Sequence, residues 1–126
     1  MRSNRELLKV AYEAFNARNI DAVLALMRAD VDWPNGMEGG RVFGRENVRG
    51  YWKRQWEIID PRVEPVRFEE DDSGRTVVIV HQVVRDLAGN LLADQMVHHV
   101  YSIKDGLIVK MDILSAGESP QAGSSN

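Results

Sequence analysis

The hydrophobic pattern of this chain changes its period near Arg62, which limits the fold to one that combines helices with a sheet. Before Arg62, apolar residues recur every three or four positions, the spacing of a helix that buries one face. After Arg62, they occur in long runs separated by turns that contain glycine and aspartate, a pattern typical of antiparallel strands. The order of these patterns predicts an α+β domain with N-terminal helices packed on a C-terminal sheet.

Three helices are predicted in the first half. Ser3 and Glu6 form a capping box that begins the first helix, and Asn19 can cap the second. A segment with four glycines precedes the third helix and is typical of a loop over the mouth of a site. The three predicted helices span about 3–18, 19–27 and 45–59. A short strand is predicted over 31–34, after the second helix.

Four long strands are predicted after Arg62, joined by three turns. Strands of about ten residues in a small domain usually twist and curve. A curved sheet with helices on its concave side encloses a cone, so we expect a cone-shaped, cystatin-like fold with a mixed or antiparallel sheet. The predicted strands cover about 63–68, 75–86, 91–103 and 107–114.

Composition excludes several classes of function. The chain has 126 residues, the size of one domain, and its net charge of −3 gives no electrostatic footprint for nucleic acid or an anionic membrane. The absence of cysteine excludes disulfides, thiolate metal sites and a cysteine nucleophile. No phosphate loop, nucleotide fingerprint or zinc motif is present, so we expect no cofactor and no metal.

The two ends of the sequence lead to two further expectations. The first ten residues carry charges where a leader would need an apolar run, and no stretch approaches the roughly 20 apolar residues of a membrane span, which predicts a cytoplasmic protein. The segment 115–126 is rich in Ser, Gly and Ala. We therefore expect a single domain over 1–114 and a flexible tail over 115–126.

Four segments occur in an order that is moderately specific for one family. They are AYEAFNARNIDAVLALM (11–27), VDWP (31–34), FGRENVRGYW (43–52) and HVYSIKDGLIVKM (99–111). Together they resemble the nuclear transport factor 2-like superfamily, and its SnoaL-like branch in particular. The resemblance implies a cone with a pocket between the sheet and the third helix, and commonly a homodimer through the outer face of the sheet.

This superfamily includes ketosteroid isomerases, polyketide cyclases, epoxide hydrolases and dehydratases, so the resemblance implies a fold more than a reaction. It places the general base of the ketosteroid isomerases at Trp33 and their protonated acid at His99. Their helix-one tyrosine falls nearest Ala11, with Tyr12 one residue out of phase. Because none of these positions carries the required group, steroid isomerisation by that mechanism is not expected.

His99 is the strongest catalytic candidate, since an imidazole in an apolar cone can act as base, acid or neutral donor. Strand alternation puts His99 and Tyr101 on one face, which the resemblance assigns to the pocket, and His98 on the other face. A turn at 88–89 would place Gln82 on the inner face with His99. The structural alternative is a histidine that is satisfied by a neighbouring group.

The turn near Gly106 decides which residue faces His99. A two-residue turn would place Asp112 opposite His99, as a dyad in which the carboxylate orients the imidazole. A three-residue loop would place Met111 there and turn Asp112 outward, which the family pattern favours.

A metal pair is conceivable on the outer face, where His81 would lie diagonal to His98. No carboxylate supplies an obvious third ligand, so an ordinary polar sheet surface is the preferred interpretation.

Aromatic residues can line a cavity or fill a core, and the sequence leaves both open. Tyr12 is interpreted as a helix-packing residue. The residues predicted to bind a ligand are Phe15, Trp33, Trp52, Trp56, Gln82 and Met111, beside the catalytic candidates His99 and Tyr101.

Two classes of function follow. The first is a cofactor-independent isomerase, cyclase or dehydratase in which His99 moves a proton on a small hydrophobic substrate. The alternative is a non-catalytic domain that binds a hydrophobic ligand or acts through dimerisation. A homodimer is expected because four apolar residues fall on the outer face of the sheet: Val77, Ile79, Val83 and Val100.

Overall fold

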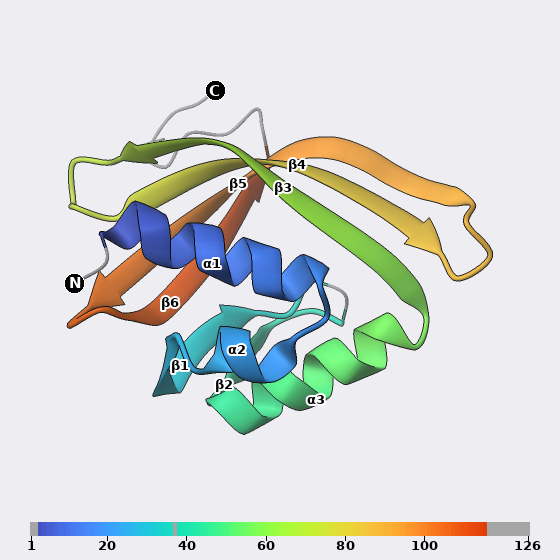
Figure 1. Ribbon diagram of the computed structural model, residues 1–126, viewed down its shortest axis with the longest axis horizontal. Helices are drawn as coiled ribbons and strands as arrows, with labels where there is room; N and C mark the ends of the chain where they lie inside the picture. Colours follow the sequence, from blue (N-terminus) through green and yellow to red (C-terminus); the bar gives the residue numbers. More distant parts are fainter. Residues whose placement is uncertain (1–2, 37, 116–126) are drawn as a thin grey trace.

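The computed structural model describes residues 3–36 and 38–115, and it confirms the α+β class (Figure 1). Within these residues, three helices and six strands follow one another. Their bounds are α1 Asn4–Asn16, α2 Ile20–Leu24, β1 Met27–Pro34, β2 Arg41–Phe43, α3 Arg45–Trp56, β3 Ile59–Glu70, β4 Thr76–Asp86, β5 Leu91–Lys104 and β6 Leu107–Ser115.

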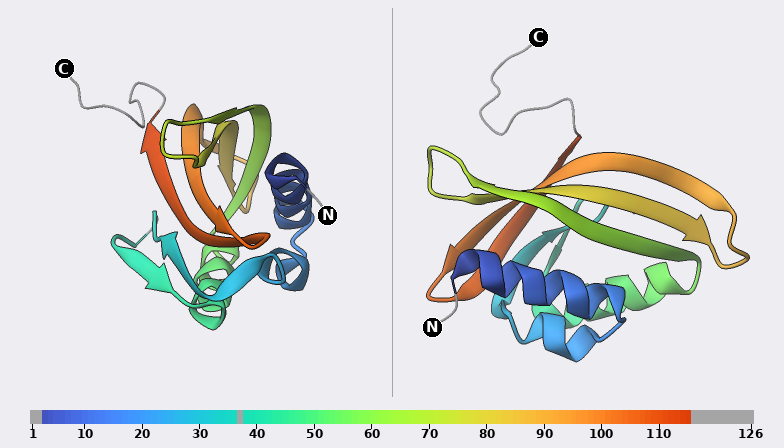
Figure 2. Two further views of the ribbon diagram at one scale, coloured as in Figure 1. Left: turned by 90° about the vertical axis from the view of Figure 1, so that its left-hand side faces the viewer. Right: turned by 45° about the horizontal axis from the view of Figure 1, so that its top comes forward.

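The six strands form one mixed sheet in the order β2-β1-β6-β5-β4-β3. All neighbouring pairs are antiparallel except β1 and β6, which run parallel. Figure 2 shows the sheet curving, with α1 and α3 on its concave side. Register shifts interrupt the β3–β4, β4–β5 and β5–β6 pairings, and such bulges increase twist locally. The predicted cone-shaped architecture is thereby confirmed.

The first helix begins as its sequence indicates. The Ser3 side chain accepts a hydrogen bond from the Glu6 amide, and the Glu6 carboxylate accepts one from the Ser3 amide. The Asn19 side chain likewise caps α2 by accepting from the amide of Ala22. Local hydrogen bonding at these helix starts is specified within four residues of sequence, which is why it was predictable.

Several elements differ from the prediction. The second helix is a single short turn that ends at Leu24, and Met27, the last residue of its predicted range, begins β1 instead. The strand β3 begins at Ile59, which the prediction gave to the third helix. The glycine-rich segment contains the short strand β2, whose residues 41–43 pair with 32–34 of β1. Three residues are too few to show strand periodicity, so only the partner strand reveals β2.

The core fills the space between the concave face of the sheet and the helices. Its largest fully buried side chains include Leu8 of α1, Val48 of α3 and Val78 of β4. No helix in the described residues is long and apolar enough to cross a membrane. Of the predicted tail, only Ser115 falls among the described residues, and it ends β6.

Arg41 links the three strands β2, β1 and β6 at one edge of the sheet. Arg41 of β2 donates to the Asp32 carboxylate of β1 at 2.6 Å and to the Asp112 carboxylate of β6 at 2.7 Å. It also donates to the Met111 carbonyl at 2.7 Å. These charge-assisted bonds hold β2, β1 and β6 in one arrangement on the outer face.

Candidate active site

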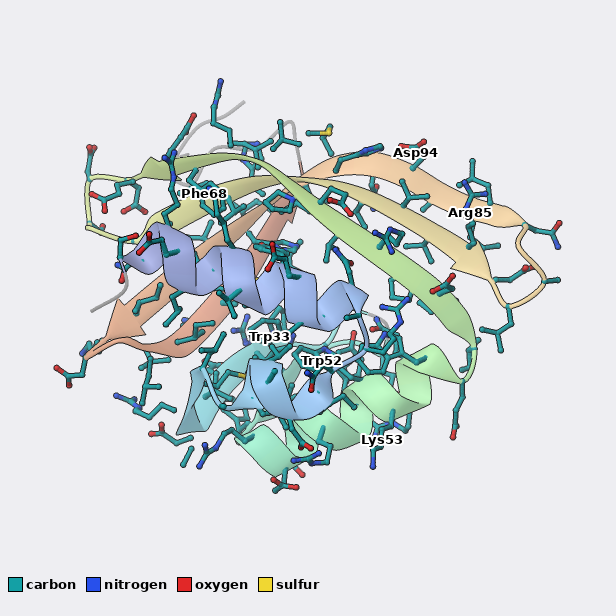
Figure 3. The ribbon with its side chains drawn as sticks, viewed as in Figure 1. Trp33, Trp52, Lys53, Phe68, Arg85 and Asp94 are labelled. Atoms are coloured by element: carbon teal, nitrogen blue, oxygen red, sulfur yellow. The ribbon has the colours of Figure 1, made fainter. Side chains whose placement is uncertain are left out.

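A cavity of about 90 Å³ lies between the concave face of the sheet and the helices. Figure 3 shows Trp33 and Trp52 in the interior, below α1 in that view. None of the residues that line the cavity is charged. Of the residues predicted to bind ligand or to act in catalysis, seven line it: Phe15, Trp33, Trp52, Gln82, His99, Tyr101 and Met111.

The size of this cavity answers whether the cone is open or filled. An engineered closed cavity of about 150 Å³ holds benzene, so the 90 Å³ here encloses only part of a ligand of that size, and the remainder would extend through the mouth. Ile113 lines the cavity and is 42% exposed, which puts it at the mouth. The cone is therefore open, but narrow.

The polar feature of the cavity is a chain of three side chains. The Tyr12 hydroxyl of α1 lies 2.7 Å from Nδ1 of His99, and the Tyr101 hydroxyl lies 2.9 Å from that of Tyr12. His99 and Tyr101 stand two residues apart on β5 and therefore share the inner face. All three side chains are buried, and His99 is only 6% exposed.

The hydrogen bonding of His99 determines what the ring offers a ligand. Nδ1 bonds to Tyr12, and Nε2 makes no hydrogen bond within the described residues, so Nε2 is the ring nitrogen that remains for a ligand. Tyr101 donates to Tyr12, so Tyr12 donates to Nδ1, and Nε2 carries the proton and is a donor. If the chain runs the other way, Nε2 is an acceptor and the Tyr101 proton is free for a ligand.

Burial keeps this chain uncharged at neutral pH. Desolvation, with a smaller contribution from the nearby His98, lowers the pKa of His99 from 6.5 to about 4. Desolvation also raises the pKa of Tyr12 and of Tyr101 well above the usual value for a phenol. The ring of His99 is therefore a neutral imidazole at pH 7 rather than a cation.

The depressed pKa of His99 predicts a pH-dependent stability. The unfolded chain binds this proton at a higher pH than the folded chain does, so the stabilisation is complete above pH 6.5 and is lost as the pH falls toward 4. The loss is on the order of 3 kcal/mol. The free energy of unfolding, measured with urea between pH 7 and pH 4, should depend less steeply on pH in His99→Asn than in the wild type. Equal dependence on pH would contradict a lowered pKa for His99.

Tyr12 is the site residue that the sequence interpretation missed. It was assigned to helix packing, yet its hydroxyl bonds to both His99 and Tyr101. The partners lie 87 and 89 residues away in sequence, so no local pattern identifies them. The available signal was its position four residues after Leu8 and three before Phe15, on the inward stripe of α1.

Neither predicted partner of His99 stands opposite it. The turn at 105–106 has two residues, but a register shift between Ser102 and Ile103 displaces the pairing, and Ile113 lies opposite His99. Asp112 faces outward, where it pairs with Arg41, so the His99–Asp112 dyad is not formed. Met111 pairs with Tyr101 and lines the cavity.

Trp56 does not line the cavity, in contrast to its predicted role. It packs behind the lining against Phe15 and Trp52, with ring centroids 5.3 and 6.0 Å apart. Two polar residues of α3 that the sequence interpretation did not select, Tyr51 and Gln55, do line it. The Gln55 amide donates to the Tyr51 hydroxyl at 3.3 Å.

On the outer face, His81 stands opposite Met96 as predicted, and its Nε2 lies 2.7 Å from the Asp94 carboxylate. His98 also falls on this face, with Nδ1 buried and unpartnered. No three metal-ligating side chains come together in the described residues.

Comparison with known proteins extends these observations. A family model described as SnoaL-like domain matches residues 9–111. An NTF2-like protein of unknown function from Burkholderia pseudomallei superposes with a TM-score of 0.78 at 29% identity, covering 91% of this chain and 92% of that one. TerC, co-crystallised with polyporic acid, superposes with a TM-score of 0.78 at 26% identity, covering 90% and 92%.

A cystatin-fold protein from Novosphingobium aromaticivorans has a TM-score of 0.73 at 21% identity, covering 90% of this chain and 99% of that one. No curated protein sequence matches the chain. The structural similarities span about nine tenths of the chain, so they concern its whole fold rather than one motif.

Proposed function

Since the chain belongs to the SnoaL-like domain family, we propose that its cavity binds a small, largely apolar molecule on which His99 transfers a proton. The observation that carries this proposal is the environment of His99. Its ring is buried and neutral, Nδ1 is held by Tyr12, and Nε2 is left for a ligand. A positioned imidazole of this kind contributes about 10²–10⁴-fold to a proton transfer.

The chemistry follows from a neutral imidazole in an apolar cavity. Nε2 can donate a proton to a carbonyl oxygen or accept one from an adjacent carbon, and both steps occur in isomerisation, cyclisation and dehydration. The half-buried Gln82 amide lines the same cavity and can position a second polar group of the ligand. Trp33 and Trp52 supply flat apolar contact.

A non-catalytic binding domain is the second candidate. The observation in its favour is that no carboxylate lines the cavity, so His99 lacks the ionised partner that would raise its basicity. In that case Nε2 would hold a ligand oxygen without moving a proton.

One screen tests the cavity and separates the two candidates. The purified protein is mixed with small cyclic ketones, with hydroxylated aromatic compounds and with polyporic acid, because a structurally similar protein was co-crystallised with it. Binding is followed through the indole NMR signals, and conversion through the ligand signals. Binding with conversion supports the enzyme, binding alone supports the second candidate, and no binding contradicts both.

We also propose a homodimer through the outer face of the sheet. Val77 and Val100 are already buried within one chain, so the face left to a partner centres on Ile79, Val83 and Met96. His98, with its unpartnered Nδ1, lies on the same face. We propose a cytoplasmic location separately, and cell fractionation tests it.

The dimer predicts a result from sedimentation. The wild type should sediment as a dimer at tens of micromolar, roughly the range of weak interface affinities. Ile79→Glu should weaken dimerisation at least ~100-fold, because it buries an unpaired charge at the centre of the interface. Lys53→Glu on the exposed face of α3 is the matched control and should leave the dimer intact. A monomeric wild type would refute the proposal.

A further inference from the structure

The two residues at the ends of the hydrogen-bonded chain line the same cavity. His99 and Tyr101 each line it, and Tyr12 joins them. We infer that Tyr12 relays a proton between His99 and Tyr101, so that the protein interconverts keto and enol tautomers of a small 1,3-dicarbonyl compound. This inference rests on the proposed function and adds to it a second catalytic residue, Tyr101, a relay and a substrate class.

The geometry allows the relay to run in both directions. The two links measure 2.7 and 2.9 Å, within the ordinary range for hydrogen bonds between these groups, so a proton can pass along each of them. Each hydroxyl can donate one hydrogen bond and accept another, and a neutral imidazole carries its proton on either nitrogen. The two directions of the chain are therefore two states of the same three side chains, and they differ only by three proton positions.

The transfer balances without any other reactant. In the structure Tyr101 donates to Tyr12, so Tyr12 donates to Nδ1 and Nε2 of His99 carries the imidazole proton. Starting from the enol, the enol O–H proton bonds to the Tyr101 oxygen, the Tyr101 proton passes to the Tyr12 oxygen, and the Tyr12 proton passes to Nδ1. The Nε2 proton bonds to the carbon between the two oxygen-bearing carbons, the C=C electron pair forms the new C–H bond, and the O–H electron pair forms the carbonyl bond. The chain is left in its opposite direction, and the reverse reaction or proton exchange with water restores it.

The surroundings of His99 favour a relay over simple protonation. No charged residue lines the cavity, and Ile113 rather than a carboxylate stands opposite His99, so an imidazolium would have no counterion. A relay that removes one proton from the ring as another arrives keeps the ring neutral. The same argument applies to the two phenols, which would otherwise ionise inside an apolar site.

The substrate class follows from this neutrality and from the size of the cavity. Both tautomers of a 1,3-dicarbonyl compound are uncharged, and the proton moves between a carbon and a nearby oxygen of one molecule. A cavity of about 90 Å³ that opens at Ile113 favours a small substrate. Acetylacetone is a suitable probe, since it is small and its enol is distinguished from its ketone by ultraviolet absorption.

The test follows the conversion of acetylacetone enol to the ketone after dilution from an aprotic solvent into buffer at pH 7. Catalytic amounts of wild type should accelerate the decay of the enol absorption, and Tyr12→Phe should lose at least ~10-fold of that acceleration. Glu13→Gln, an exposed neighbour on α1, is the matched control and should behave as wild type. No acceleration by wild type would overturn the inference.

Two further readouts separate a relay from a structural role for Tyr12. A plot of the wild-type rate against the fraction of D₂O should be curved, because several protons move together. The same plot for the residual rate of Tyr12→Phe should be linear. The His99 ring nitrogen NMR shifts should also change in Tyr101→Phe, whose altered residue does not touch the imidazole nitrogens. Unchanged shifts, or full activity in Tyr12→Phe, would overturn the relay.

The same samples distinguish failure of the relay from failure of the proposed function. Acetylacetone that binds, as shown by the indole signals, without faster tautomerisation overturns the relay and leaves the binding cavity standing. Acetylacetone that neither binds nor reacts contradicts the substrate class, and the ligand screen then decides the proposed function by itself.

Discussion

Replacing His99 with asparagine is expected to lower the turnover of a substrate accepted by the cavity by about 10²–10⁴-fold. The asparagine side chain can still accept a hydrogen bond from Tyr12 near the position of Nδ1, but it has no counterpart of Nε2. Ligand binding should change much less, because the aromatic lining is untouched. Turnover is measured by NMR with the best compound from the screen, and binding by titration of the indole signals.

The control for this variant is His81→Asn. His81 lies on the outer face, where it pairs with Asp94, so the same chemical change there should leave turnover unaltered. If His99→Asn retains the turnover of the wild type, His99 is not the proton-transfer group. If it abolishes binding as well as turnover, His99 acts chiefly as an anchor for the ligand, and the non-catalytic candidate gains support.

Replacing Trp52 with alanine should destabilise the fold by about 3–5 kcal/mol. Trp52 is 2% exposed and sits at the centre of an aromatic cluster, with ring centroids 5.2 Å from Phe15, 5.5 Å from Trp33 and 6.0 Å from Trp56. Its removal enlarges a cavity that is already open and takes one contact from each of three aromatic rings. A loss of this size is a large fraction of the roughly 5–15 kcal/mol that stabilises a typical domain.

Urea unfolding at pH 7 measures this loss. Lys53→Ala is the matched control, since Lys53 follows Trp52 on α3, is exposed, and lies on the outside of the helix in Figure 3. It should change the free energy of unfolding by no more than about 0.5 kcal/mol. A loss below about 1 kcal/mol for Trp52→Ala would show that the indole lines a void and supports little of the core.

Much of the fold was predictable because its signals are local. The capping box at Ser3, the cap at Asn19 and the change of hydrophobic period near Arg62 each depend on residues within a few positions of one another. The shared face of His99, Tyr101 and Gln82 likewise follows from strand alternation once the turn is known, and the family resemblance identified that face as the inner one. These expectations agree with the structure for the same reason: backbone geometry repeats over two to four residues.

The candidate site was only partly predictable, because its hydrogen bonds join distant segments. The inward stripe of α1 shows that Tyr12 faces the sheet, but only the docking of the helix brings its hydroxyl to His99 on β5. The partner of His99 depended on a bulge in the β5–β6 pairing. A bulge responds to the twist of the whole sheet, and no count of turn residues reveals it.

The sequence by itself determined the class of fold, the faces of the long strands and the absence of thiol chemistry, since each depends on residue type and local spacing. Only the tertiary structure decided that the cone keeps an open cavity, that Trp56 stands behind its lining, and that Ile113 rather than Asp112 faces His99. These features depend on how elements far apart in sequence pack against one another, and packing is settled by the shape of all the side chains together.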